Sequence, residues 1–305
     1  MIVIHMIGGL GNQMYQYAMY LKLKSLGKKV CIDVTDYMPY AWEAEPRSLD
    51  ILRFTDADFE RCTRLQRFLV KHDDPSFAGK VWRKLFGRGK HIYEEHQDYD
   101  PAVFELEKGY LDGFWNCEKY FYDIIPLLQE KFTFPKTIDI ITPFHVNRMH
   151  EYDSIGIHIR RTDYVDDEHR WRYGGICTDQ YYWNAIQYAQ KFVKNPIYYV
   201  FTDDLDYANS KISMVVRGMF PPPEVILCDW NEKGNSIYDM LMMSHCKVMI
   251  CANSTFSMWG ARLSKREDKV MIRPFRHDNV QDFSVEYMKD AWKDWVLIKE
   301  DGTIV

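Results

Sequence analysis

The feature that most constrains the fold is the stretch of residues 155–164, an apolar half followed by a charged half that begins with two arginines. Apolar side chains occupy every second position from Ile155 to Ile159, a period typical of a buried β-strand. Arg160 and Arg161 follow where this pattern ends. In an open α/β sheet the ligand binds at the carboxyl ends of the strands, and adjacent guanidinium groups suit a diphosphate. The alternative is an exposed charged turn with a local ion pair.

The amino-terminal segment has the layout of a ligand-binding α/β unit. Residues 2–7 predict a strand, residues 8–13 a glycine loop, residues 14–26 a helix and residues 28–33 a second, parallel strand. Glycines let the backbone approach a ligand, and a helix start offers unpaired N–H groups. The glycine spacing differs from GxGxxG, so a nicotinamide cofactor is not expected. The alternative is a tight turn with an asparagine cap.

An acidic run follows the strand predicted at residues 197–201, with Asp203, Asp204 and Asp206 close together. Carboxylates at this position can accept hydrogen bonds from a guanine edge or a ribose. Asp204 and Asp206 can instead chelate a divalent cation as an Asp-x-Asp pair. The third alternative is a helix cap supplied by Thr202 or Asp203.

A further strand, predicted at residues 248–252, leads into small hydroxyl residues. Ser254 and Thr255 stand where a helix opens, and their hydroxyls together with exposed N–H groups can form an anion site. Simple capping of the helix is the alternative.

Residues 109–122 are densely aromatic and predict a strand and turn. Core packing is the default explanation of this density. A platform for an acceptor sugar ring is the sharper alternative.

Length and charge bound the organisation of the chain. Its 305 residues predict two domains, and we place the boundary in the proline-containing segment 132–152, which gives domains of 1–150 and 151–305. The final segment can pack back on the first domain. A formal charge of −5 provides no field that attracts nucleic acid, so a nucleic-acid partner is not expected.

The cysteines and the apolar runs bear on location. Seven scattered cysteines without a CxxC pair predict neither a disulfide framework nor a zinc site, and favour a reducing compartment. The amino terminus lacks the basic region of a secretion leader, and no apolar run approaches the roughly 18 residues of a spanning helix. We expect a cytoplasmic protein. Basic and bulky apolar residues at 81–91 leave room for a peripheral contact at the inner face of the membrane.

Four ordered segments resemble the family 11 glycosyltransferases, the α-1,2-fucosyltransferases, in their bacterial form. They are Gly8-Gly-Leu-Gly-Asn-Gln-Met14, His158-Ile-Arg-Arg-Thr-Asp-Tyr164, Phe201-Thr-Asp-Asp204 and Asn253-Ser-Thr-Phe-Ser-Met-Trp-Gly-Ala261, and residues 113–121 resemble a further family segment. The resemblance implies an α/β, GT-B-like fold of two Rossmann-type domains with a donor cleft between them. Asn116 and Met258 stand where Gln and a second Trp are common, which bears on the acceptor preference.

The resemblance also implies a reaction. Fucose is transferred with inversion from GDP-fucose, a co-substrate, to the 2-hydroxyl of a terminal β-galactoside on an oligosaccharide or glycan precursor, with no cofactor and no metal. By this resemblance Arg160 binds the β-phosphate and offsets the charge of the leaving GDP. The other donor-binding residues implied are His158, Arg161, Asp163, Asp203, Asp204, Ser254, Thr255 and Phe256.

On the acceptor side the resemblance points to Asn12, together with Gly11, Gln13 and Trp115. Asparagine cannot act as a base at neutral pH, so Asn12 is expected to position the acceptor or a water molecule. No residue stands out as a general base. Two other classes of function remain open: a metal-dependent glycosyltransferase that uses Asp204 and Asp206, and a non-catalytic module that binds nucleotide sugars or glycans.

Overall fold

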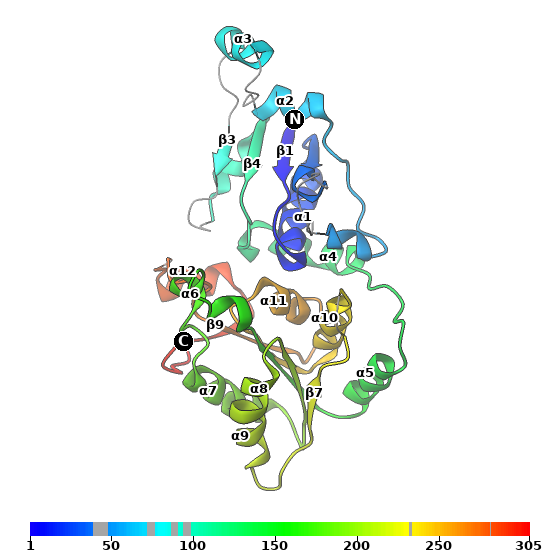
Figure 1. Ribbon diagram of the computed structural model, residues 1–305, viewed down its shortest axis with the longest axis vertical. Coiled ribbons are helices and arrows are strands. Elements are labelled where there is room, and N and C mark those ends of the chain that lie inside the picture. Colours follow the sequence, from blue (N-terminus) through cyan, green and yellow to red (C-terminus); the bar gives the residue numbers. More distant parts are fainter. Residues whose placement is uncertain (39–47, 72–76, 87–90, 94–98, 232–233, 281) are drawn as a thin grey trace. The chain divides into compact units, whose positions relative to one another are not determined.

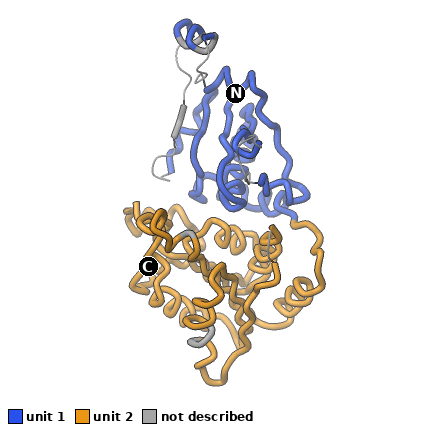
Figure 2. The backbone as a smooth tube through the Cα atoms, in the orientation of Figure 1, with its two compact units in different colours: residues 1–133 blue, residues 134–305 orange. Residues whose placement is uncertain are grey.

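The computed structural model of the protein describes residues 1–38, 48–71, 77–86, 91–93, 99–231, 234–280 and 282–305. The chain forms two compact units, Met1–Thr133 and Phe134–Val305 (Figure 2). Each unit contains one parallel β-sheet with helices, so the expected α/β class with two Rossmann-type units is confirmed.

The boundary lies at the beginning of the expected linker and not at residue 150. The reason is that the segment after Thr133 packs on the second unit. The indole Nε1 of Trp230 donates to Thr142 Oγ1 at 3.1 Å, and the Tyr238 hydroxyl donates to the backbone oxygen of Lys136 at 3.0 Å. These contacts bring the helix α5 (Ile141–Glu151) into the second unit.

The first unit has a four-stranded sheet in the order β2-β1-β4-β3, with every pair parallel (Figure 1). The chain leaves β1 toward β2 on one side and returns to β3 and β4 on the other. The position between β1 and β4 is therefore the topological switch point, where open α/β sheets bind ligands. The strands are β1 (Ile2–His5), β2 (Val30–Asp33), β3 (His91–Tyr93) and β4 (Gly109–Asp112), and the helices are α1 (Leu10–Ser25), α2 (Arg64–Lys71), α3 (Phe77–Phe86) and α4 (Ile125–Lys131).

The helix α1 begins at Leu10, four residues earlier than the sequence suggested. Gly9 is the N-cap in an extended conformation, and its carbonyl accepts from the N–H groups of Asn12 and Gln13 at 3.0 Å each. Gly8 makes the turn before it with φ +82, a conformation that favours glycine. Only the first two glycines form a loop, and the third lies inside the helix.

The second unit has a six-stranded parallel sheet in the order β10-β9-β8-β5-β6-β7. Numbered within the unit and read from β7, this is the order 3-2-1-4-5-6 of doubly wound folds. The switch point lies between β5 and β8. The last strand, β10, completes this sheet. The strands are β5 (Ser154–Ile159), β6 (Ile197–Thr202), β7 (Val225–Cys228), β8 (Val248–Ile250), β9 (Val270–Pro274) and β10 (Trp295–Ile298).

Helices connect these strands. They are α6 (Arg170–Tyr173), α7 (Asp179–Ala189), α8 (Leu205–Tyr207), which continues through a π-helical turn (Ala208–Ser213) into α9 (Met214–Arg217), α10 (Ser236–His245), α11 (Thr255–Arg262) and α12 (Val285–Ala291).

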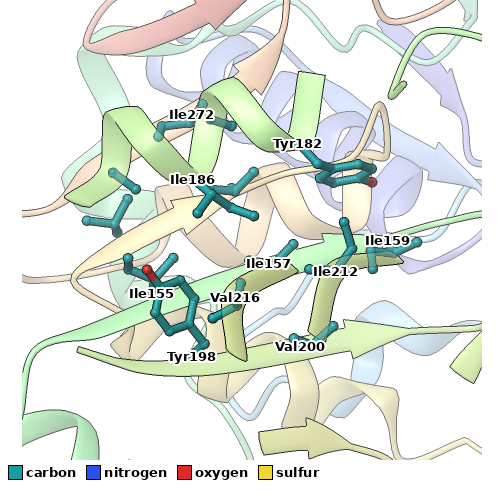
Figure 3. Close-up of a cluster of buried hydrophobic side chains, with 14 of the residues drawn as sticks. Ile155, Ile157, Ile159, Tyr182, Ile186, Tyr198, Val200, Ile212, Val216 and Ile272 are labelled. Atoms are coloured by element: carbon teal, nitrogen blue, oxygen red, sulfur yellow. The ribbon is translucent and has the colours of Figure 1, made fainter. Parts of the chain in front are cut away.

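The core of the second unit forms around β5, where the period-two pattern predicted a strand. Ile155, Ile157 and Ile159 are buried on one face of β5 and belong to one cluster with Tyr182 and Ile186 of α7 (Figure 3). This packing fixes the position at which the strand ends and the arginines begin.

Two further expectations concern the whole chain. Of the helices in the described ranges, none has the length and apolar character needed to cross a membrane. All seven cysteines carry free thiols.

Candidate donor and acceptor sites

Arg160 and Arg161 leave the carboxyl end of β5 at the switch point of the second unit, and each contacts a carboxylate that follows β6. The Nε atom of Arg160 lies 3.3 Å from Asp203 Oδ2, and the Nε atom of Arg161 lies 3.1 Å from Asp204 Oδ2. The Arg161 guanidinium also stacks over the Tyr207 ring at 3.9 Å. The Arg160 side chain is more than a third exposed and the Arg161 side chain about a third exposed, so a ligand can reach both.

Asp203 and Asp204 are already engaged with this turn. Asp203 Oδ1 accepts from the Arg161 backbone N–H at 2.8 Å, and its Oδ2 accepts from the Thr162 hydroxyl at 2.7 Å. Asp204 is the cap of α8, because its Oδ1 accepts from the Tyr207 N–H at 2.9 Å. The helix cap that the sequence placed at Thr202 or Asp203 is therefore Asp204, the next residue in the chain. The two carboxylates neutralise the two arginines and hold the turn between β5 and Thr162.

His158 lies inside β5 next to this turn and is buried. Burial, and then the nearby charge of Arg160, lower its pKa to about 3, so the imidazole is neutral at physiological pH. Its ring lies 6.1 Å from that of Phe256. Among the described residues, none makes a hydrogen bond to its Nδ1. Asp163 belongs to a 3₁₀ turn after the arginines, and its side chain lies outside the described residues.

Ser254 is the N-cap of α11, directly after β8 on the other side of the switch point. Its side chain makes no capping hydrogen bond to the helix, although its backbone conformation is that of a cap. Ser254 therefore caps α11 through its backbone and not through its hydroxyl. Thr255 and Phe256 form the first turn of α11, whose N–H groups carry the positive end of the helix dipole.

A pocket opens beside the arginine turn, and aromatic residues that were not among the expected binding residues form its walls. Besides Arg160 and Arg161, its lining includes Tyr164, Tyr173 and Tyr207. The Tyr164 and Tyr173 rings are stacked at 4.9 Å, and the Tyr164 hydroxyl donates to the Asn253 backbone oxygen at 3.2 Å. Residues from three strand ends thus meet in one pocket.

The wall that carries Tyr173 is held by buried polar side chains. Asn253, which is 1% exposed, donates to the backbone oxygens of Tyr173 and His277 at 3.2 and 3.0 Å. Arg172 pairs with the buried Asp278 at 3.2 Å. A Cβ atom at Gly174 would lie 2.7 Å from a backbone oxygen, so only glycine fits the turn. The Tyr-Gly-Gly run at residues 173–175 was the available sequence signal.

In the first unit, the expected acceptor-side residues gather at the switch point between β1 and β4, but Gly11, Gln13 and Trp115 are buried. Gln13 is fully buried. Its side-chain Nε2 donates hydrogen bonds to the backbone oxygens of Gly8 and Ser48, and its Oε1 accepts one from the Ile51 N–H, which makes it a positioning residue. Trp115 is 2% exposed and packs edge-on against Tyr120. The core-packing alternative thus holds for Trp115, which is no exposed platform for a sugar. Gly11 and Asn12 lie in the first turn of α1.

Three titratable residues that sequence reasoning missed meet at this same edge. His5 Nδ1 lies 3.0 Å from Asp112 Oδ1, and His5 Nε2 lies 3.2 Å from Asp36 Oδ1. Asp36 follows β2, His5 ends β1 and Asp112 ends β4, and these three strands are neighbours. Asp36 is half exposed, whereas His5 is 13% exposed. The sequence signal for this cluster was a polar residue at or after the end of each strand, but the three residues are spread over more than 100 positions of the chain.

We expect this cluster to stabilise the fold more at pH 6 than at pH 9. Burial lowers the pKa of His5, but Asp112 and Asp36 outweigh that effect and the net pKa is raised. A raised pKa contributes stability below the unfolded-state pKa, and that contribution is lost as pH rises through the folded-state pKa. Replacing His5 by Gln should lower the unfolding free energy by about 1 kcal/mol more at pH 6 than at pH 9. Denaturant unfolding of the wild type and the His5→Gln variant at the two pH values measures this difference. Asp112→Asn should remove the same pH-dependent part of the stability. An equal loss at both pH values would contradict it.

The acidic residues after β6 also bear on the metal alternative. Within the described ranges, no group of three or more His, Cys, Asp or Glu side chains is placed to hold a metal ion. Asp204 faces Arg161, and Asp206 is exposed in the first turn of α8.

The second unit is therefore a doubly wound α/β unit. Two arginines, the amino terminus of a helix and a pocket with aromatic walls lie at its switch point. This arrangement is typical of proteins that bind phosphate-bearing ligands. Comparisons with known proteins narrow this class. The sequence profile of Glycosyl transferase family 11 matches residues 81–299. The chain belongs to this family.

Three known proteins are similar to most of the chain. The Alpha-1,2-colitosyltransferase of Escherichia coli is 30% identical over 280 residues, which span 90% of this chain and 91% of that protein. The O-antigen biosynthesis glycosyltransferase WbnK of Escherichia coli is 27% identical, over 88% and 91% of the two chains. The Galactoside alpha-(1,2)-fucosyltransferase 2 of Bos taurus is 24% identical, over 88% and 70%.

Proposed function

We propose that this family 11 glycosyltransferase transfers L-fucose from GDP-fucose to the 2-hydroxyl of a terminal β-galactoside, with inversion and without a divalent metal. The observation that carries the proposal is the pair Arg160 and Arg161 at the switch point of the second unit. A galactoside fucosyltransferase among the relatives supports the choice of sugar and acceptor.

Arg160 and Arg161 supply the chemistry that a leaving diphosphate needs. As the bond to the fucose anomeric carbon breaks, negative charge grows on the β-phosphate, and fixed donors stabilise it. A guanidinium fork does this bidentately, and the amino terminus of α11 adds N–H groups beyond β8. Because Asp203 and Asp204 already neutralise the arginines, a diphosphate has to compete with them. The carboxylates then serve to hold the forks in place before the donor arrives.

The acceptor sugar is proposed to bind at the switch point of the first unit. Asn12 stands in the first turn of α1, and the half-exposed carboxylate of Asp36 is suited to accept hydrogen bonds from sugar hydroxyls. His5 and Asp112 hold that carboxylate in position.

The donor assignment predicts a preference for GDP over UDP. Guanine offers donors at N1 and N2 that a carboxylate or a backbone carbonyl can accept, and uracil lacks the second of them. We expect GDP to bind at least tenfold more tightly, the equivalent of one charge-assisted hydrogen bond. Calorimetry with the two nucleotides measures this. Equal affinities would remove GDP-fucose as the donor.

The 30% identical colitosyltransferase favours a second candidate donor. Colitose is fucose without its 3-hydroxyl group, so both sugars present the same leaving group to Arg160. Turnover measured with each GDP-sugar and one galactoside distinguishes the two, and we expect the fucose donor to be the faster.

We further propose a cytoplasmic location with a peripheral contact at the inner face of the membrane. The free state of all seven cysteines supports a reducing compartment. The basic and apolar residues at 81–91 support the contact.

A further inference from the structure

We propose that α3, with its exposed lysines, docks the protein on an anionic lipid bilayer. The inference develops the peripheral contact proposed above, rests on it, and is independent of the donor chemistry. It starts from exposed apolar side chains that belong to one helix, α3.

The apolar side chains form one stripe. Phe77, Val81 and Leu85 are spaced four residues apart, and each step of four turns a helix by only about 40°. They are 82%, 41% and 70% exposed. Exposure of single apolar residues is ordinary, but three in register along one helix face indicate a surface that another phase or molecule covers.

Positive charge borders this stripe. Lys80 and Lys84 are exposed and fall within about 60° of Phe77 around the helix axis, on one side of the stripe. Residues 64–90 contain eight Lys or Arg and two Asp, a formal charge of +6 in a chain whose formal charge is −5. The sequence segment that contains α3 is therefore basic, whereas the chain as a whole is acidic.

This combination fits an anionic bilayer better than a second copy of the chain. An interfacial helix buries its apolar face at the acyl boundary while lysine ammonium groups meet lipid phosphates and anionic headgroups. In a symmetric dimer the same face would meet itself and bring two +6 segments together. Phe, Val and Leu provide no partner for nucleic-acid phosphates.

The preceding helix, α2, provides an anchor for this surface. Val70 of α2 is buried with the strand residues Val3 and Tyr110, and Lys71 lies 4.5 Å from the Tyr110 ring. Arg67 donates to Thr35 Oγ1 at 2.8 Å. These residues face the sheet of the first unit, so they are not part of the proposed lipid-facing surface.

The test is sedimentation of the full chain with vesicles of phosphatidylcholine alone and of phosphatidylcholine with 30 mol% phosphatidylglycerol, roughly the anionic content that gives a strong surface potential. We expect binding to the anionic vesicles only, weakened by salt. Phe77→Ser/Leu85→Ser should lower the vesicle affinity at least tenfold. Lys80→Gln/Lys84→Gln should lower it about thirtyfold, or about 1 kcal/mol for each lysine.

Matched controls lie on the second unit. Ile140→Ser removes an 87% exposed apolar side chain, and Lys265→Gln/Lys289→Gln removes two exposed lysines, and neither should change vesicle binding. Thermal unfolding confirms that each variant is folded. Transfer to a soluble galactoside, measured without vesicles, should be unchanged in the α3 variants, so a failure of the proposed chemistry is seen separately.

Three results would overturn the proposal: no binding of the wild-type chain to anionic vesicles, equal loss in the control variants, or binding that survives both α3 variants. A wild-type dimer that the α3 variants convert to monomers, without vesicle binding, would assign the stripe to self-association instead.

Discussion

Replacing Arg160 by Lys should lower turnover about a hundredfold. The substitution keeps the positive charge but removes the planar fork that matches a phosphate bidentately. If the contact strengthens as GDP gains charge, its loss costs about 3 kcal/mol in the transition state, which is roughly a hundredfold in rate. Steady-state kinetics with GDP-fucose measures this, and we expect the fall in kcat and not in the KM for the acceptor.

Arg217→Lys is the matched control, because Arg217 is an exposed arginine of the same unit at the end of α9. It should behave as the wild type does. Near-normal turnover of Arg160→Lys would move Arg160 out of the catalytic site.

Replacing Asp203 by Asn should lower kcat/KM about thirtyfold. Electrostatics alone predicts the opposite, since the variant leaves the arginines more positive toward a diphosphate. Asp203, however, holds the turn through Arg160 Nε, the Arg161 N–H and the Thr162 hydroxyl. Loss of charge-assisted hydrogen bonds of this kind costs about 2 kcal/mol, and the forks lose the orientation that catalysis requires.

Asp206→Asn is the informative control for Asp203→Asn. Asp206 is exposed and three residues along the same segment, so its replacement should leave turnover unchanged. A metal site of the Asp-x-Asp type predicts a severe loss at Asp206 instead. The two variants together separate a positioning carboxylate from a metal ligand.

The sequence predicted the strands that position the candidate donor site because their signal is local. The alternation from Ile155 to Ile159 places Arg160 at a strand end, and burial of those isoleucines against α7 bears this out. The strands before Asp203 and Asn253 were found in the same way. Since parallel strands share one edge, three strand ends were enough to bring these residues together.

Other features depend on contacts that no local pattern carries. The engagement of Asp203 with the Arg161 N–H joins residues 42 positions apart, and the approach of His5 to Asp112 joins residues 107 apart. Residue type alone did not show that Trp115 and Gln13 are buried, since a glycine-rich, aromatic segment suits a binding surface as well as a core. The boundary between the two units lies earlier in the chain than the sequence predicted, because Thr142 and Lys136 accept hydrogen bonds from side chains of the second unit.

The most direct test of the arginine-based mechanism is fucosyl transfer by metal-stripped protein in excess EDTA. GDP-fucose and a β-galactoside are supplied, GDP release is followed with and without the acceptor, and the product linkage is determined. We predict undiminished, acceptor-dependent release and an α-1,2 linkage. Turnover that vanishes in EDTA and returns with Mn²⁺ or Mg²⁺ would show that a metal, and not Arg160 and Arg161, offsets the charge of the leaving diphosphate.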